Sequence, residues 1–442
     1  MFVYNKCKQL ISKTTLQSHF SFVLIFLIKP NKKKKKTGLA LNNLSIGSVS
    51  SLQNIKQTDV FPYILALIPW VILPFSPMIA SVVGLFLLII FSSVFTKKSR
   101  VIISLCIILS ASIYNGDCIP HSDYINYYRT YEKLLNNNFQ ALFDCGAGLE
   151  IALPLYYFIL SRFLGELSSS TFIAINIFTA ALLFYIWLEV YAMSYIAPKQ
   201  RTLCVALSLL FFHYWFAGWL VRQVFSSVFL LYAFTEKRLK LHLVYVVVAV
   251  LFHITALGFY LFVWLLMKKP KIGMMISLLL MLGFYFFDEI IRFLWELPIQ
   301  VVFINSLKLK AGAYLFNSTL FDGNFIQAKN FVITFMLICF AYLYVDKAHK
   351  QWRYVILGFV AVYWGSIGVS NHFSLRVGVL LLEIAFGYFV FLAMRKQPFL
   401  LQIFALLVLL NLISVKTYFG DIINTRVYWN YDIAGPFFYF LF

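Results

Sequence analysis

The sequence predicts an all-α fold, a polytopic integral membrane bundle of helices. Apolar residues make up 62% of the 442-residue chain and charged residues only 12%, so lipid must surround most side chains. The apolar stretches are continuous, as in residues 82–95 and 331–345, whereas strands of a membrane barrel alternate apolar and polar residues. At about 20 residues for each spanning helix, the chain has room for roughly a dozen of them.

A few ionisable residues stand inside the apolar runs, and they indicate where function should be sought. A charged side chain in such a position costs about 2.5 kcal/mol or more unless a cavity or a partner stabilises it. The residues concerned are Glu189, Arg222, His253, Arg376 and Glu383.

The first 60 residues differ in composition from the rest. Their single apolar patch, residues 21–28, is too short to span a bilayer and is followed by lysines at 32–36. In a signal peptide the basic residues come first, so we expect 1–60 to be a basic, disordered cytoplasmic extension. Residues 61–442 then form the membrane domain, with outer loops at 116–149 and 293–329.

The membrane domain contains about 11–13 hydrophobic segments, depending on how many of them cross. If all crossed, the basic residues at 199–201 and 237–240 would lie outside, against the preference of Lys and Arg for the cytoplasmic side. We therefore expect two segments, 150–166 and 241–267, to be re-entrant. Both contain residues that can cause a break, Glu150 and Pro154 in the first and His253 and Gly258 in the second. Such breaks are tolerated where protein or a wet cavity surrounds them.

Composition also argues against nucleic-acid binding and against a zinc site. The net charge of +20 comes from short clusters beside apolar runs, as in segments that orient membrane helices, so nucleic acid is not an expected partner. The six cysteines include no Cys-x-x-Cys pair, which argues against a zinc site. Cys118 and Cys145 share one polar loop and either form a disulfide or remain free thiols. We predict no cofactor and no metal, with a cation held by Asp117 and Asp123 as an open alternative.

The first outer loop holds the first group of candidate site residues. Asp123 and Arg129 lie close together in sequence, and Glu150 stands at the edge of the next apolar segment. If 123–135 is helical, Asp123, Tyr127 and Tyr131 fall on one face. The alternative is a solvated amphipathic helix whose tyrosines lie at the membrane interface.

Arg222 and His253 lie within apolar segments. The guanidinium of Arg222 keeps its charge and needs an anion or water, and phosphate matches its forked geometry. The alternative is a structural ion pair, for example with Glu189. His253 is either a packing residue or a proton acceptor whose ordinary pKa lies near neutrality.

A third group lies near the end of the chain. His372 and Arg376 are four residues apart at the outer entrance of a helix and so share one face. Two arginines, Arg222 and Arg376, that met at one outward cavity would suit a diphosphate. The sequence contains no P-loop, His-Glu-x-x-His or nucleophile elbow, so hydrolase and nucleotide-binding functions have no support.

In their order, these motifs resemble the EpsG family of bacterial polysaccharide proteins, which is related to Wzy-type O-antigen and capsule polymerases. The family shows an Asp-Tyr with spaced aromatics, a Glu-containing segment, an Arg-Gln pair, a His-x-Ser/Thr-Ala motif and a late Arg. This chain has SDYINYYRTYEKL (122–134), GLEIALPLYYFILSRF (148–163), VRQVFSSVFLLYAF (221–234), HITALGFYLF (253–262) and LRVGVLLLEI (375–384). The family's Glu often continues Pro-Gly, whereas Glu150 continues Ile-Ala-Leu-Pro.

The resemblance, which covers about residues 61–415, implies a glycosyltransferase-C-like, multi-pass protein of the bacterial cytoplasmic (inner) membrane. It would polymerise an O-antigen, capsule or exopolysaccharide by moving the growing glycan from polyprenyl diphosphate to the next lipid-linked repeat unit. Fixed cations would stabilise the leaving diphosphate and a base would serve the acceptor hydroxyl. The expected catalytic residues are Asp123, Glu150 and His253. The expected substrate-binding residues are Tyr127, Arg129, Arg222, Gln223, His372 and Arg376.

The expected partners are undecaprenyl-diphosphate-linked oligosaccharide and membrane lipid, with a chain-length regulator as a further candidate. Two other functions stay open. One is a membrane glycosyltransferase that uses a polyprenyl-phosphate sugar, with Asp117 and Asp123 central. The other is a transporter or flippase of lipid-linked sugars, although the two-fold repeat of interrupted helices common in transporters is not evident here.

Overall fold

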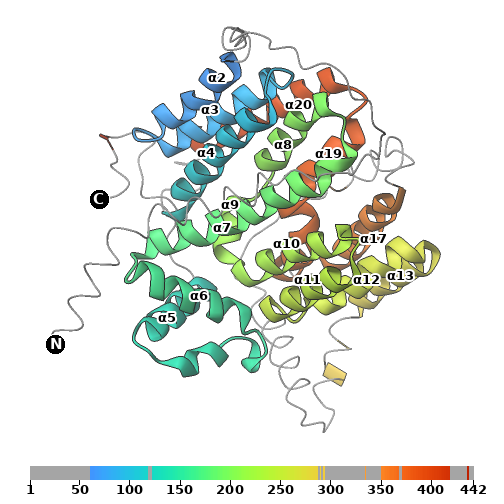
Figure 1. Ribbon diagram of the computed structural model, residues 1–442. Coiled ribbons are helices and arrows are strands. Elements are labelled where there is room, and N and C mark those ends of the chain that lie inside the picture. The colour runs from blue at the N-terminus through green and yellow to red at the C-terminus, as the bar shows by residue number, and fades with distance from the viewer. Residues whose placement is uncertain are drawn as a thin grey trace, which may run out of the picture. The chain divides into compact units, whose positions relative to one another are not determined.

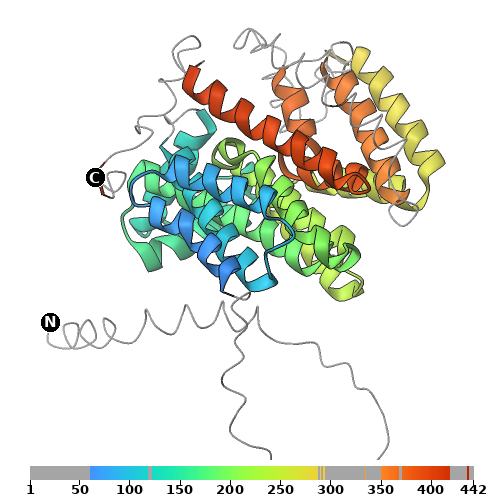
Figure 2. The same ribbon diagram turned by 90° about the horizontal axis from the view of Figure 1, so that it is seen from above.

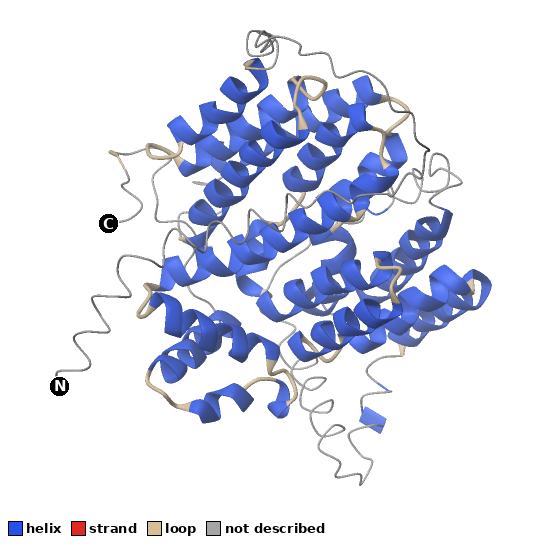
Figure 3. Cartoon of the chain, viewed as in Figure 1, coloured by secondary structure: helices blue, strands red, loops and turns tan. Residues whose placement is uncertain are grey.

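The computed structural model describes residues 60–117, 122–286, 350–367 and 371–418, together with 289, 292–293, 334 and 436–437. In this part of the chain every regular element is a helix (Figure 1, Figure 3), which confirms the all-α class. Apart from one residue each, the predicted extension 1–60 and the predicted loop 293–329 lie outside the described residues.

The helices follow one another with short connections. The first part contains α2 (Phe61–Ile72), α3 (Pro77–Ile90), α4 (Lys97–Gly116), α5 (Ser122–Leu135), the short η2 (Phe139–Phe143) and η3 (Gly146–Gly148), α6 (Ala152–Leu164) and α7 (Ser169–Val190). The middle part contains η4 (Ala192–Tyr195), η5 (Pro198–Gln200), α8 (Arg201–Leu210), α9 (Tyr214–Trp219), α10 (Val221–Thr235), α11 (Leu239–Phe252), α12 (Ala256–Lys268) and α13 (Pro270–Tyr285). The last part contains α17 (Lys350–Ile367), α18 (Asn371–Gly378), η8 (Val379–Ile384), α19 (Phe386–Met394) and α20 (Pro398–Tyr418). Helix α20 packs against α3 and α19 (Figure 2).

Two of the described helical stretches, Lys97–Gly116 and Ser169–Tyr195, are long and apolar enough to cross a membrane. Other apolar helices have 10–17 residues, and about 20 are needed to cross a hydrocarbon core of about 30 Å. These helices are consistent with a helical membrane protein. The expected number of spans stays a prediction.

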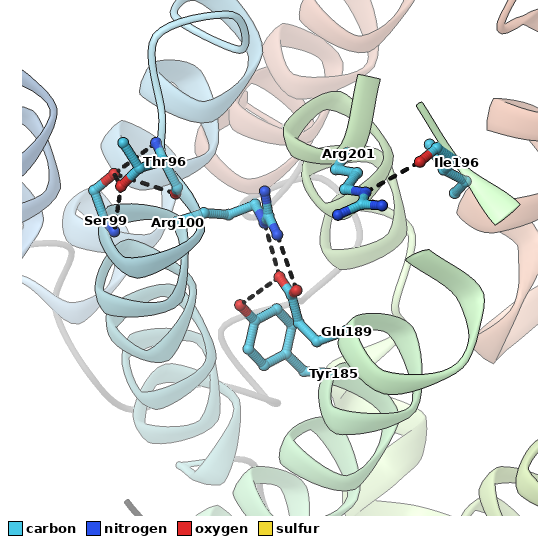
Figure 4. A network of polar contacts seen from close by, with 7 residues as sticks. All are labelled: Thr96, Ser99, Arg100, Tyr185, Glu189, Ile196 and Arg201. Carbon is cyan, nitrogen blue, oxygen red and sulfur yellow. Dashed lines mark hydrogen bonds and ion pairs between the residues drawn. The ribbon is translucent and has the colours of Figure 1, made fainter. Parts of the chain in front are cut away.

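Helices α4 and α7 pack side by side and run in opposite directions. Thr96 begins α4 with a capping box to Ser99, which satisfies backbone groups that the first turn leaves open. One turn later, Arg100 forms a bidentate ion pair with Glu189 near the end of α7, at 2.7 and 2.9 Å (Figure 4). Tyr185 donates a hydrogen bond to the same carboxylate. The partner of Glu189 is therefore Arg100, and the alternative of a pair with Arg222 is wrong.

The basic clusters between helices gather at one end of the bundle, which we call the basic end. Three contacts join them besides the Arg100 pair. Gln200 donates to the carbonyl of Arg395 at 2.9 Å, Tyr191 donates to Glu236 at 2.9 Å, and Lys237 lies over the ring of Tyr195. The basic end comprises Lys97, Lys98, Arg100, Lys199, Arg201, Lys237, Arg238, Lys240, Arg395 and Lys396.

The two segments expected to be re-entrant have different structures. Segment 241–267 is broken into α11 and α12, and the break begins at His253, whose backbone is extended. Gly258 lies inside α12 and does not cause the break. In the other segment, α6 is a single helix that begins after Glu150, with its proline in the first turn, where no N–H is needed. Whether either segment crosses a membrane stays a prediction.

Candidate functional site

Polar side chains from five separate segments meet away from the basic end. The last residue of α10, Thr235, accepts a hydrogen bond from Trp187, which lies near the end of α7 and so close to the basic end. Arg222 lies more than three turns earlier on α10 and is therefore far from the basic end. The segments that join Arg222 are the start of α5, the loop before α6, the α11–α12 break and α18. We call this group the polar cluster: Asp123, Tyr127, Glu150, Arg222, Gln223, His253 and Arg376.

Helix α5 is held to the start of α7 and the loop before it by three tyrosine hydroxyls. Those of Tyr124, Tyr128 and Tyr131 donate to the carbonyls of Ser169, Leu167 and Gly165. Asp123 and Tyr127 instead contribute to the polar cluster.

Tyr131 lies two turns beyond Asp123 on α5, as expected, but its hydroxyl bonds to Gly165 and it does not line the pocket at the polar cluster. Eight residues at about 100° each leave an offset of about 80° around the helix. The rings of Tyr124, Tyr127 and Tyr131 are all buried. The aromatic face of α5 is therefore part of the core, against the alternative of a solvated amphipathic helix.

Glu150 is completely buried beneath the cluster and joins three segments. Its Oε2 accepts from Nη1 of Arg222 at 2.5 Å, and its Oε1 accepts from Nδ1 of His253 at 2.8 Å and from the backbone N–H of Ile254 at 3.1 Å. Burial opposes ionisation of the Glu150 carboxyl. The contacts with His253 and Arg222 and the hydrogen bond from the backbone N–H of Ile254 outweigh this effect. They lower the pKa of Glu150, which precedes α6, from 4.5 to about 2.

The loop before α6 requires glycine where it approaches Glu150. Gly146 has a φ of +58°, in the left-handed region that other residues rarely adopt. A Cβ atom at this position would lie 2.4 Å from Cγ of Glu150. The glycine therefore lets the backbone pass directly against the buried carboxylate side chain.

Arg222 lies in the first turn of α10, between Glu150 and α5. Its Nε donates to the hydroxyl of Tyr127 at 3.1 Å, and the guanidinium carbon lies 5.5 Å from the centre of that ring. Burial raises the pKa of Tyr127 to about 12, so the phenol stays neutral. Among the described residues, Nη2 of Arg222 has no hydrogen-bond partner.

Arg376 reaches the cluster from α18. Its Nη2 lies 3.2 Å from Oδ2 of Asp123, and each side chain is about one-third exposed, at 33% and 35%. The amide nitrogen of Gln223 donates to the backbone carbonyl of Arg376 and so ties α18 to α10. The amide oxygen of Gln223 is buried and finds no hydrogen-bond partner among the described residues.

These side chains line a small open pocket with about 180 Å³ of empty space, including its mouth. Its lining residues are Asp123, Tyr127, Leu220, Arg222, Gln223, His253 and Arg376. The two arginines that the sequence singled out thus belong to one pocket. Together with a carboxylate, a phenol and an imidazole braced by Glu150, they can bind an anion next to groups that accept or donate protons.

Other candidate residues lie elsewhere. Glu150 lies beneath the pocket and does not line it, and Arg129 is exposed on α5. His372 belongs to α18, but its side chain lies outside the described residues. Asp117 is the C-cap of α4 and is not among the lining residues. No three metal-binding side chains gather in the described parts of the chain.

Cys145 is buried as a free thiol, and its candidate partner Cys118 lies outside the described residues. Glu383, one of the few charges in an apolar run, pairs with His213 at 2.6 Å. Sequence reasoning missed His213, although a second histidine in an apolar run was a usable signal.

A family model described as the EpsG family matches residues 101–432, which include every residue of the polar cluster. No curated protein and no solved structure matches the chain.

Proposed function

Because the chain belongs to the EpsG family, we propose that it polymerises a bacterial surface polysaccharide in the cytoplasmic membrane. Family membership indicates polysaccharide biosynthesis and, with the apolar helices, a membrane protein. In the proposed reaction the growing glycan leaves undecaprenyl diphosphate and joins a hydroxyl of the next lipid-linked repeat unit. The pocket would face the outer side, because it lies away from the basic end and Lys and Arg favour the cytoplasmic side.

The meeting of Arg222 and Arg376 at one pocket is the observation that carries this proposal. The bond that breaks joins the anomeric carbon of the glycan to a diphosphate oxygen, and negative charge develops on that oxygen. Guanidinium groups already in place stabilise this charge without reorganising during the reaction. Their forked N–H groups also match phosphate oxygens better than an ammonium group does.

The two arginines have unequal partners, which suggests how a diphosphate enters. The Arg222–Glu150 pair is buried, so separating it would leave a charge without compensation. The Arg376–Asp123 pair is longer and partly exposed, and such pairs contribute about 1 kcal/mol or less. A diphosphate would therefore replace Asp123 on Arg376 and leave Arg222 anchored to Glu150.

This exchange prepares a base. Once the diphosphate takes Arg376, the Asp123 carboxylate is released from its ion pair and can accept a hydrogen bond from the acceptor hydroxyl. In the proposed reaction Asp123 accepts the proton of the acceptor hydroxyl as the new glycosidic bond forms. The bonding electrons of the broken bond stay with the leaving diphosphate. His253, oriented by Glu150, and the amide oxygen of Gln223 would contact sugar hydroxyls in the same pocket.

The proposal is tested with Arg222→Lys and Arg376→Lys variants expressed at the wild-type level. Polymer length on gels should collapse to single repeat units, because a lysine keeps the charge but not the two-pronged contact. Arg129→Lys, on the exposed face of α5, is the matched control and should keep long polymer. Normal long polymer in either pocket variant would contradict the assignment.

The same strains distinguish the other two functions. Loss of a polymerase leaves single repeat units on the outer leaflet. A glycan that lacks one particular sugar would indicate a transferase dependent on polyprenyl-phosphate sugar. Repeat units trapped on the inner leaflet would indicate a flippase.

A further inference from the structure

The helix that carries Arg376 changes its winding three residues later. Helices α18 and α19 are joined by a π-helical turn, Val379–Ile384, in which the N–H of Ala385 bonds to the carbonyl of Leu380, five residues back, at 3.1 Å. A π turn accommodates one residue more than an α-helical turn and is rare, and such turns are frequent at functional sites. This turn separates α18, which carries Arg376, from α19.

Glu383 in the π turn is clamped by His213, the residue before α9. The backbone N–H of His213 donates to the carbonyl of Glu383 at 2.8 Å. Its ring Nδ1 lies 2.6 Å from Oε2 of the same residue. His213, which lies outside the helix, thus bonds both the backbone carbonyl and the carboxylate of Glu383. The centre of its imidazole ring lies 4.5 Å from the centre of the Phe216 ring.

The helices on both sides of the π turn are fixed to other elements. In α19, Gly387 lies so close to α8 that a Cβ atom would meet the carbonyl oxygen of Leu207. In α18, the side chain of Gln223 holds the carbonyl of Arg376. Between these two attachment points the chain has one residue more than a continuous α-helix would need, and the π turn accommodates it.

We propose that His213 and Glu383 are positioning residues for Arg376. By holding the π turn, they set the rotation of α18 that brings the guanidinium to the pocket. If the turn relaxed to an α-helix while α19 stayed in place, α18 would rotate by about 100° and shift by about 1.5 Å along its axis. The guanidinium of Arg376 would then leave Asp123 and the pocket. The functional side of this inference rests on the proposed role of Arg376 as a diphosphate ligand.

Substituting Glu383 should therefore impair polymer formation more than deleting it. Glu383→Ala removes the clamp but keeps the extra residue, so α18 slips and polymer formation falls by about tenfold to a hundredfold. Deleting Glu383 removes the clamp and the extra residue together, so a continuous α-helix restores the rotation of Arg376. Polymer formation by the deletion variant should exceed that of Glu383→Ala at equal protein level.

His213 is tested in both backgrounds. His213→Ala should reduce polymer formation in the otherwise wild-type chain, mainly through a higher KM for the lipid diphosphate donor. It should have little further effect when Glu383 is deleted. His213→Asn, which keeps a side-chain N–H donor, should be milder than His213→Ala.

A second measurement follows the rotation of α18 independently of activity. In a background without native cysteines, Asp123→Cys and Arg376→Cys are joined by a short bifunctional thiol reagent. We expect efficient cross-linking, a strong decrease when Glu383→Ala is added, and recovery when Glu383 is deleted. Unchanged cross-linking in the Glu383→Ala background would overturn the inference. If cross-linking follows this pattern but polymer does not, the positioning stands and the proposed role of Arg376 fails.

Discussion

Nη1 of Arg222 lies 2.5 Å from Oε2 of Glu150, a carboxylate with no exposed surface. The same carboxylate holds His253 at 2.8 Å. Glu150 therefore orients two residues that line the pocket while it stays out of the pocket itself. Because Glu150 does not line the pocket, we propose a positioning role for it in place of the catalytic role expected from the sequence.

Glu150→Gln should destabilise the protein by about 3 kcal/mol, because removing one partner of a buried pair leaves the other charge without compensation. The measurement is the thermal unfolding temperature of the purified protein in detergent. The matched control is Glu189→Gln, which breaks the buried pair with Arg100 at the basic end. Both variants should unfold earlier, but only Glu150→Gln should abolish polymer formation by the protein that remains folded.

The contribution of Glu150 should also depend on pH. Its pKa falls from 4.5 to about 2 on folding, so the unfolded chain takes up the proton first as pH decreases. The stabilisation is therefore complete above about pH 5 and is lost as pH falls towards 2. The difference in unfolding temperature between wild type and Glu150→Gln should stay constant from neutral pH to about 5 and shrink below. A difference that shrinks between pH 7 and 5 would contradict the ionised, tightly held carboxylate.

Asp123→Asn should separate binding from chemistry. The variant loses the proposed base, so kcat for polymerisation should fall by about a hundredfold or more. It also loses the carboxylate that competes with the diphosphate for Arg376, so KM for the lipid-linked donor should not rise. Kinetics with purified protein and a defined lipid-linked repeat unit provide both values. A higher KM with unchanged kcat would assign Asp123 to binding instead.

Gly146→Ala should disturb the site by displacing the side chain of Glu150. The substitution adds backbone strain of about 1–2 kcal/mol and places a methyl group against the side chain of Glu150. Gly148→Ala is the control, because Gly148 also has a positive φ but its nearest neighbours would lie at 3.9 Å, an ordinary contact. Both variants should lose some thermal stability, whereas a large loss of polymer is expected for Gly146→Ala alone. Equal losses would show that strain, and not the contact with Glu150, matters.

Much of the site could be predicted because charge is so unfavourable in apolar segments. Arg222, His253 and Arg376 stand out for that reason, and all three line the pocket. A break within segment 241–267 was also predicted, from the placement of the basic residues at 199–201 and 237–240, with His253 and Gly258 as its candidate causes. These predictions depend only on composition and on how charges are distributed along the chain.

Other features depend on contacts between residues far apart in the sequence. The partner of Glu189 is 89 residues away, and nothing local indicates Arg100 rather than Arg222. Tyr131 follows Tyr127 on α5 but bonds to Gly165 instead of lining the pocket, because a small offset per turn accumulates over two turns. From the sequence, Glu150 resembles a surface acid at the edge of a helix. Only the tertiary structure shows that it is buried and that its carboxylate forms three contacts, with Arg222, His253 and Ile254.

By itself, the sequence determined the helical class, the apolar character of the helices and the small set of charges that needed partners. Which charges pair, which carboxylate faces the pocket and how α18 is rotated were decided by the tertiary structure. LRVGVLLLEI reads as a regular apolar helix, yet its π turn exists where His213 supplies donors to Glu383. The physical reason is that apolar patterning specifies burial along one segment, whereas the direction of a polar bond is set by atoms that other segments bring.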